Sequence, residues 1–241
     1  YGSNRQFYRI EIPVEAVAAE LTRFRDAIAA ARKQLSRLAG RNKGAIGHSG
    51  PGIFAAHLAL IDDPSFGSKI ENEITRQRVN AEWAIKSVTD EYVSKYKAVT
   101  DEHLRDRYID IEDVSDRILS ALGGSSELEL LFGKDSVVVA EDLKPSTLVE
   151  IFAHGPRAFI TENGGWTSHS FILAREMKRP AVTGVKKIFR QIKTGDRVIV
   201  DGFNGQVILN PEPEALARVS KTRPQTEIKS SERPAQLGPI A

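Results

Sequence analysis

The chain has 241 residues, a length that corresponds to one large domain or two small ones. Hydrophobic residues make up 41% and charged residues 27%, which excludes a fibrous or wholly disordered chain. The absence of cysteine excludes disulfides, thiolate metal sites and a cysteine nucleophile. The net charge of +2 gives no reason to expect a nucleic acid or an anionic membrane as partner. No apolar run is long enough to span a bilayer, so we expect a soluble, cytoplasmic protein.

The first half of the chain predicts helices. Between residues 14 and 38 apolar side chains recur at spacings of three and four, which places them on one helical stripe: Val14, Val17, Leu21, Phe24, Ile28, Ala31, Leu35 and Leu38. Residues 40–52 contain five glycines and predict a loop. Further helices are expected over 53–61, after a cap at Asp63, after a cap at Asn80, and over 104–122. We therefore predict a helical bundle over residues 14–124.

The pattern changes after Gly124. Short β-type runs at 137–140, 158–161, 181–183, 197–201 and 206–209 alternate with helix-like segments at 146–153 and 168–178. This alternation is typical of a compact α/β domain. The last two runs flank residues 202–205, a predicted hairpin turn, and the proline-rich residues 211–241 predict a linker that begins with a short helix.

The segment TENGGWTSHSFILAR, residues 161–175, is the best candidate for chemistry. A predicted strand ends there, a glycine pair turns the chain, and His169 falls in the first turn of the next predicted helix. The free N–H groups and positive dipole end of a helix stabilise a phosphoryl group on the imidazole and keep the ring neutral and nucleophilic. Backbone and hydroxyl donors for phosphate oxygens would come from Gly164, Gly165, Thr167 and Ser168. A plain helix start remains the alternative.

The same segment resembles a phosphohistidine signature. GGWTSHSFILAR at 164–175, followed by RPAVTG at 179–184, is similar to the signature of the phosphoenolpyruvate-utilising enzymes. GIFAAHLALIDD at 52–63 and DEHLRDRYIDIEDV at 101–114 are similar to the helical subdomain of enzyme I, the branch that serves the bacterial phosphotransferase system. The resemblance covers most of residues 10–210 and corresponds to the amino-terminal half of enzyme I.

The resemblance implies an α/β swivelling phosphohistidine domain with an inserted all-α helical-bundle subdomain. Residues 1–13 would supply the opening strand of the phosphohistidine domain, and residues 14–124 the subdomain that docks the phosphocarrier protein HPr. Residues 125–210 would form the α/β phosphohistidine domain itself, and residues 211–241 a linker towards a barrel domain that binds phosphoenolpyruvate. On this basis we expect the chain to be an amino-terminal fragment and monomeric, because enzyme I dimerises through the barrel.

The resemblance also implies a phosphoryl relay. His169 would take a phosphoryl group from phosphoenolpyruvate and pass it to a histidine of HPr. Arg107 matches an arginine near the carrier interface that neutralises phosphate in transit, and His57, on the predicted docking helix, is a second candidate for that interface. Without the resemblance, Arg107 is more simply paired with Asp110 on its own helix, and His57 is more simply a satisfied core histidine. No metal or cofactor is expected in this chain, and magnesium only in the phosphoenolpyruvate-binding domain.

Two departures from the enzyme I pattern leave other functions open. Trp166 stands where enzyme I has an arginine, and Leu148 where it has a threonine that steadies the histidine, with Thr147 as a substitute beside it. One alternative is the phosphohistidine swivel of a pyruvate phosphate dikinase or phosphoenolpyruvate synthase. Another is a catalytically silent docking module. The sequence does not distinguish a sugar-transport branch from a nitrogen-regulatory one.

Overall fold

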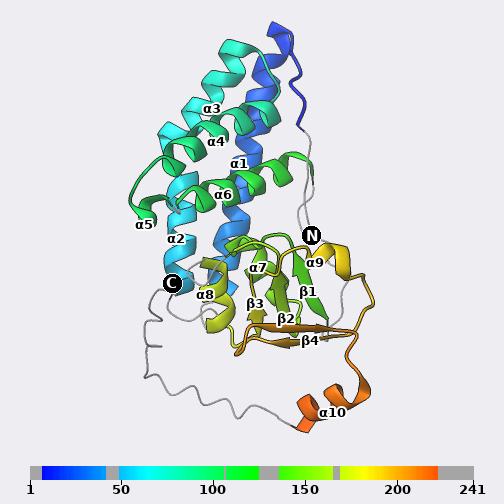
Figure 1. Ribbon diagram of the computed structural model, residues 1–241. Helices are drawn as coiled ribbons and strands as arrows, with labels where there is room; N and C mark the ends of the chain where they lie inside the picture. Colours follow the sequence, from blue (N-terminus) through cyan, green and yellow to red (C-terminus); the bar gives the residue numbers. More distant parts are fainter. Residues whose placement is uncertain (1–6, 42–48, 106, 125–135, 165–168, 222–241) are drawn as a thin grey trace.

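The computed structural model describes residues 7–41, 49–105, 107–124, 136–164 and 169–221. Figure 1 shows a tall bundle of helices above a smaller part in which strands and helices are mixed. The helices before residue 124 belong to the bundle, and the strands, all after residue 136, belong to the smaller part. The expected fold class, a helical subdomain joined to an α/β domain, is confirmed.

The bundle is organised around a long helix, α1 (Val17–Arg41), which follows the short 3-10 helix η1 (Val14–Ala16). The stripe predicted from the spacing faces the core, since Phe24, Ala31 and Leu35 are buried. Val14 is 66% exposed because it lies in η1, ahead of the regular helix. The prediction is therefore correct for the body of the helix and wrong for its first member.

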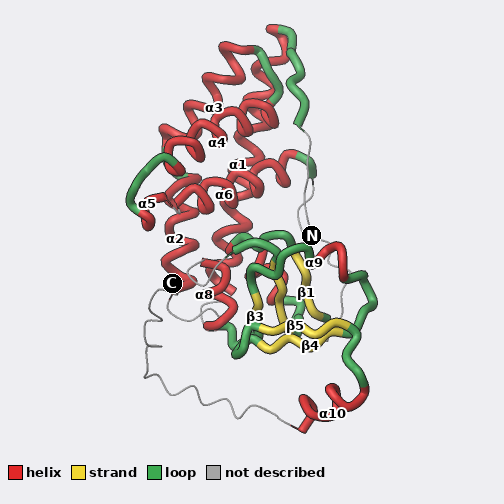
Figure 2. The backbone as a smooth tube through the Cα atoms, viewed as in Figure 1, coloured by secondary structure: helices red, strands yellow, loops and turns green. Residues whose placement is uncertain are grey.

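Five more helices of the bundle lie within the described residues. They are α2 (Ser49–Ile61), α3 (Pro64–Gln77), α4 (Ala81–Lys97), α5 (Glu102–Arg105) and α6 (Arg107–Leu122). The predicted glycine loop is shorter than expected, because α1 runs to its end at residue 41 and α2 already begins at residue 49; residues 42–48 lie outside the description. Helix α6 packs against α1, α2 and α4, as the crossing tubes in Figure 2 show.

The core of the bundle is made of large apolar side chains. The most deeply buried include Phe54, Phe66, Ile70, Ile74, Ile85 and Ile118. Each contributes roughly 1.5–3 kcal/mol when it leaves water. This burial, rather than any single polar contact, holds the helices together.

The start of α3 follows the sequence prediction. Asp63 accepts a hydrogen bond from the backbone N–H of Ser65 at 2.8 Å, and Pro64 occupies the first helical position. The hydroxyl and backbone N–H of Ser65 hold the pKa of the Asp63 carboxyl below its ordinary value. The predicted cap is confirmed.

The start of α4 is stabilised in a different way from the one predicted. Asn80 stands at the N-cap position, but its side chain makes no capping hydrogen bond. Its Oδ1 accepts from the backbone N–H of Ile10 at 3.0 Å, and its Nδ2 donates to Glu82 at 3.0 Å. The N–H of Ala81 is bound by Glu20 of α1 instead, at 2.6 Å. The helix start was predicted correctly, and the capping group was not.

The segment before η1 pairs with the bundle. We expected residues 1–13 to form the opening strand of the phosphohistidine domain, but residues 7–13 lie along the turn between α3 and α4. Ile12 N donates to Arg78 O at 2.8 Å, Asn80 N donates to Ile10 O at 3.0 Å, and Glu11 forms an antiparallel bridge with Val79. This turn satisfies their backbone groups, so the expectation is wrong for these residues; residues 1–6 lie outside the description.

In the α/β part, the residues that the structure describes form two small sheets. Strands β1 (Val137–Ala140), β2 (Ala158–Thr161) and β3 (Ala181–Val182) pair in parallel in the order β1-β2-β3. Strands β4 (Val198–Asp201) and β5 (Gln206–Leu209) form an antiparallel hairpin. The connecting helices are α7 (Pro145–Phe152), α8 (His169–Glu176) and α9 (Ile188–Gln191), of which α9 was not predicted. A further helix, α10 (Pro213–Lys221), occupies the start of the predicted linker.

The predicted turn between β4 and β5 is confirmed. Asp201 Oδ1 accepts the backbone N–H groups of Phe203 and Asn204, both at 2.9 Å. The hydrogen bonds from the backbone and side chain of Asn204 hold the pKa of Asp201 below its ordinary value. Gly202 lies so close to β3 that a Cβ there would be 3.1 Å from the backbone nitrogen of Ala181. The hairpin therefore packs directly against the start of β3.

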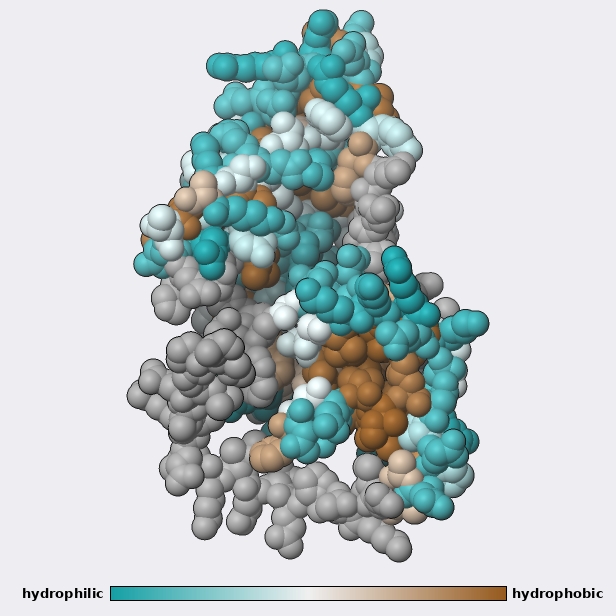
Figure 3. Space-filling view, viewed as in Figure 1, coloured by the Kyte–Doolittle hydropathy of each residue, from teal (hydrophilic) through white to brown (hydrophobic). Residues whose placement is uncertain are grey.

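The surface differs between the two parts. In Figure 3 the visible face of the bundle is mostly hydrophilic, whereas an apolar area lies over the α/β part. None of the helices in the described ranges is long and apolar enough to cross a membrane.

Candidate functional site

The candidate site lies where the parallel strands end. Because β1, β2 and β3 run in the same direction, their carboxyl ends meet at one edge of the sheet, where α/β proteins commonly bind ligands. The chain leaves β2 through a turn in which Asn163 N donates to Glu141 O at 2.9 Å and Thr161 Oγ1 donates to Asn163 O at 2.6 Å. Gly164 has φ of +101°, a backbone conformation that favours glycine. The turn is thus tied to the end of β1 before the chain enters α8.

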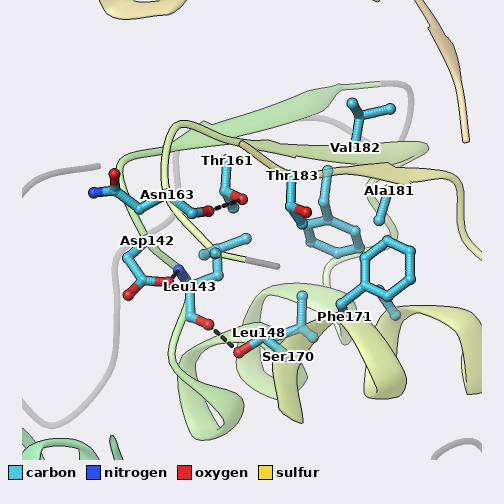
Figure 4. Close-up of a pocket in the computed structure, with 13 residues that line it drawn as sticks. Asp142, Leu143, Leu148, Thr161, Asn163, Ser170, Phe171, Ala181, Val182 and Thr183 are labelled. Atoms are coloured by element: carbon cyan, nitrogen blue, oxygen red, sulfur yellow. Dashed lines mark hydrogen bonds between the residues drawn. The ribbon is translucent and has the colours of Figure 1, made fainter. Parts of the chain in front are cut away.

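A hollow lies between this edge and α8. Figure 4 shows Thr161 and Thr183 on the sheet side of this hollow and Leu148 of α7 and Phe171 of α8 on the other. The amide of Asn163, at the rim, points outwards. The Ser170 hydroxyl, in the first turn of α8, donates to the backbone carbonyl of Leu143, which precedes α7. This bond fixes the start of α8 against the loop that follows β1.

His169 is the first residue of α8. Its backbone is therefore at the amino terminus of a helix that begins beside the carboxyl edge of a parallel sheet, the arrangement that binds phosphate in many α/β proteins. Of the four predicted phosphate-positioning residues the structure describes Gly164. Gly165, Thr167 and Ser168 lie outside the described residues, as does the side chain of His169.

The two residues considered for steadying the histidine have different surroundings. Leu148 is 1% exposed and lines the hollow beside α8. Thr147 is half-buried, and it is not among the residues that line the hollow. The wall of the site next to α7 is therefore apolar at Leu148.

Arg107 lies in the other part of the molecule, at the first position of α6. Its side chain is 51% exposed, and its Nη1 is 3.4 Å from Oδ2 of Asp110. This is the pairing with Asp110, on the same helix, that the spacing predicted. The long distance and the exposure leave the guanidinium accessible at the surface of the bundle.

His57 is not at the surface. Its side chain is fully buried in α2, and its Nε2 lies 3.1 Å from Oδ1 of Asp110 and 3.9 Å from Oδ2 of Asp113. The simpler interpretation, a histidine satisfied within the core, fits this position. The proposal that His57 itself contacts a carrier does not, because the ring is enclosed between α2 and α6.

Sequence reasoning missed a polar contact between the two parts. Asp113 of α6 accepts hydrogen bonds from the backbone N–H and the hydroxyl of Ser146 in α7, at 2.9 and 2.5 Å. Arg117 donates to Ser146 Oγ at 2.9 Å and to Glu150 at 3.0 Å. The signal in the sequence is a pair of carboxylates, Asp110 and Asp113, set among the apolar positions of one helix.

The described part of the chain contains no cluster of side chains suited to a metal ion. No group of three or more histidine or acidic side chains is arranged there to hold one. What the site offers instead is a helix amino terminus, a glycine turn and an apolar hollow, which suits an anionic group held by N–H donors.

Two family models match this chain. The first, described as the N-terminal domain of PEP-utilising enzymes, matches residues 5–107. The second, described as their mobile domain, matches residues 132–205 and so includes β2, the glycine turn and α8. This chain belongs to the family of PEP-utilising enzymes. The family resemblance seen in the sequence is confirmed.

Named relatives of this family agree. Phosphoenolpyruvate-protein phosphotransferases from Bacillus sp. (strain S) and Geobacillus stearothermophilus are each 38% identical over 234 residues, or 93% of this chain. The enzyme of the same name from Listeria monocytogenes is 34% identical over 91% of it. The chain spans only 40% of the length of the first two relatives and 38% of the third.

Solved structures show the same fold. A solution NMR structure of an Enzyme I protein (nEIt) has a TM-score of 0.72 and 32% identity, and the match covers 90% of this chain and 88% of that one. A structure of the N-terminal domain of Enzyme 1 - Nitrogen has a TM-score of 0.61 at 22% identity, over 90% of this chain and 87% of that one. The second similarity supports the fold alone.

Proposed function

We propose that this chain is the phosphohistidine-bearing part of a phosphoenolpyruvate-protein phosphotransferase. His169 accepts a phosphoryl group and passes it to a histidine of a small phosphocarrier protein of the HPr type. The observation that carries this proposal is the position of His169 as the first residue of α8, which begins beside the carboxyl edge of the parallel sheet. The family assignment supports it, because the mobile-domain match includes this segment.

The chemistry is two successive phosphoryl transfers. In the first, an imidazole nitrogen of His169 forms a bond to phosphorus while the P–O bond of phosphoenolpyruvate breaks, and the enolate that leaves takes up a proton to become pyruvate. In the second, the P–N bond breaks as a nitrogen of the carrier's histidine binds the phosphorus. We assign the binding of phosphoenolpyruvate and magnesium to a separate barrel domain of the whole enzyme.

Both transfers depend on positioning and on charge. The N–H groups at the start of α8 and the positive end of its dipole favour the doubly negative phosphoryl group over the bare ring. Gly164 and Gly165 would let the backbone approach phosphate oxygens, and Thr167 and Ser168 would add hydroxyl donors. Arg107, exposed on the bundle, would neutralise the phosphoryl group while it passes to the docked carrier.

Reverse transfer tests this proposal without phosphoenolpyruvate. The chain is incubated with a phosphorylated HPr-type carrier, and phosphorus NMR and intact mass report the phosphate that it gains. We expect an acid-labile P–N phosphate on the wild-type chain and none on His169→Ala. His154→Ala is the matched control, because His154 is exposed just after α7, and we expect it to be phosphorylated like the wild type.

Other outcomes of the reverse-transfer experiment would contradict the proposed relay. Carrier binding without phosphate transfer would mean that the chain is a docking module that has lost its chemistry. Neither binding nor transfer would favour the phosphohistidine swivel of a dikinase or synthase. Phosphate that persists on His169→Ala would place the acceptor elsewhere.

A further inference from the structure

A buried histidine lies directly behind the exposed arginine of the bundle. The carboxylate of Asp110 is only 7% exposed, and its two oxygens have different partners. Oδ1 is 3.1 Å from His57 Nε2, on the inner side, and Oδ2 is 3.4 Å from Arg107 Nη1, on the outer side. The ring of His57 and the guanidinium of Arg107 are therefore held by one carboxylate.

The ring itself has little freedom. His57 is fully buried and meets Phe54 edge to face, with the ring centroids 6.0 Å apart. Its Nε2 faces two carboxylates, Asp110 and Asp113, so we assign the ring N–H to this nitrogen. A ring that turned would lose these contacts; in its present position it meets Oδ1 of Asp110, while Oδ2 of the same carboxylate lies beside Arg107.

This arrangement is costly for a residue that only fills space. The Nδ1 atom of His57 is buried and has no hydrogen-bond partner within the described residues. A buried polar atom without a partner destabilises a protein, whereas a leucine would fill the same interface with no such penalty. A leucine at position 57 would, however, lose the contact to Asp110.

An isolated pair between Arg107 and Asp110 would position the arginine poorly. Ion pairs at this spacing on an exposed helix surface are weak, and a half-exposed arginine loses much side-chain freedom when it is held. A carboxylate that is already oriented removes part of that cost, because only one of the two partners then has to be ordered.

We propose that His57 is a positioning residue for phosphoryl transfer to the carrier, acting through Asp110 on Arg107. It touches neither the phosphoryl group nor the carrier. The inference rests on the proposed function, because it takes Arg107 as the cation that neutralises the phosphoryl group in transit. It assigns to His57 a role from inside the core in place of the surface role expected from sequence.

The test compares His57→Leu, His57→Gln and Arg107→Ala in transfer from the phosphorylated HPr-type carrier, with rates corrected for the folded fraction. Leucine keeps the bulk of the side chain and removes the donor, whereas the amide nitrogen of glutamine reaches about as far as Nε2 and keeps it. We expect His57→Leu to lower kcat about tenfold with a KM for the carrier within about twofold of wild type. His57→Gln should restore kcat to within about threefold of wild type.

The double variant separates positioning from general stability. If His57 acts through Arg107, His57→Leu should change kcat by less than about twofold in the Arg107→Ala background. An equal loss in both backgrounds, or no loss in the single variant, would overturn the inference. If His57→Leu does not fold, Asp110→Asn replaces it in the same cycle with the same expected non-additivity.

These variants distinguish the relay through His169 from the role of His57. Phosphate on His169→Ala would overturn the proposed function itself. A normal rate for Arg107→Ala, with His169→Ala inactive, would leave the relay standing and remove the role of Arg107 together with that of His57. Slow transfer by Arg107→Ala together with a normal transfer rate for His57→Leu would overturn only the inference about His57.

Discussion

The carboxylate of Asp113 binds both the backbone N–H and the hydroxyl of Ser146, at 2.9 and 2.5 Å. Ser146 lies in the first turn of α7, so the bundle caps a helix of the α/β part across the junction between them. Asp113 is buried, with 3% of its side chain exposed. A charge in such a place stabilises the fold only while its hydrogen bonds persist.

Removing this contact should loosen the junction. We expect Asp113→Ala to cost about 2–3 kcal/mol of unfolding free energy, and Ser146→Ala about 1–2 kcal/mol, because the backbone bond remains in the second variant. Urea unfolding followed by circular dichroism measures both. Asp116→Ala is the control, since its carboxylate is 52% exposed and pairs with Lys144 at the same junction. Equal effects at the two aspartates would contradict the capping role.

Acid should weaken the cluster around Arg23. Arg23 donates to Glu20 at 2.6 Å and to Glu82 at 2.7 Å. Hydrogen bonds from Arg23 lower the pKa of Glu82. Burial acts to raise the pKa of Glu20, but the hydrogen bonds from Arg23 and from the N–H of Ala81 outweigh burial, so the pKa of Glu20 is lowered as well. A carboxyl whose pKa is lower in the folded than in the unfolded state stabilises the fold at pH values above its ordinary pKa of 4.5. This contribution is lost as the pH falls below 4.5.

The comparison of wild type with Arg23→Met isolates this contribution. We expect the wild type to be more stable by about 1 kcal/mol at neutral pH, since the cluster is partly exposed to solvent. The difference should shrink steadily below pH 4.5, the ordinary pKa of both carboxyls, as they become protonated. Urea titrations at a series of pH values measure it. A difference that stays constant or grows in acid would show that the cluster does not act through these charges.

Asn80 should hold the opening segment against the bundle. Its Oδ1 accepts the N–H of Ile10 at 3.0 Å. We expect Asn80→Ala to lower stability by about 1 kcal/mol and to speed amide hydrogen exchange at Ile10 and Ile12. Ile118, in the middle of α6, serves as the reference amide and should change less. Uniform acceleration at all three amides would mean that only global stability had changed.

Two glycines should respond in opposite directions to alanine. At Gly202 a Cβ would lie 3.1 Å from Ala181 N and 3.2 Å from Pro180 Cα, so the hairpin must shift from its seat on β3. At Gly67, inside α3, a Cβ would meet nothing within 4 Å. We expect Gly202→Ala to destabilise the fold by about 1–3 kcal/mol and Gly67→Ala to stabilise it by roughly 0.5–1 kcal/mol. Thermal unfolding compares them, and a stabilised Gly202→Ala would contradict the close packing.

Much of the site could be predicted because its signals are local. A strand, a glycine turn and a helix start follow one another within residues 158–176, and each depends on residues close in the chain. Gly164 adopts the backbone conformation that its residue type favours, and His169 begins α8. The same holds for the cap at Asp63 and the turn at Asp201, whose bonds span two or three residues.

Local sequence patterns alone predict the helical periods, the strand and turn positions, the family signature and the histidine at the start of α8, since all of these depend on neighbours a few residues apart. The packing of the whole chain makes Asn80 bind the opening segment instead of capping α4, and it encloses His57 beside Asp110. It also makes Asp113 cap α7. These contacts join residues separated by 70, 53 and 33 positions. A polar side chain at such a position takes whichever partner the packing of apolar faces brings to it, and that packing is a property of the whole fold.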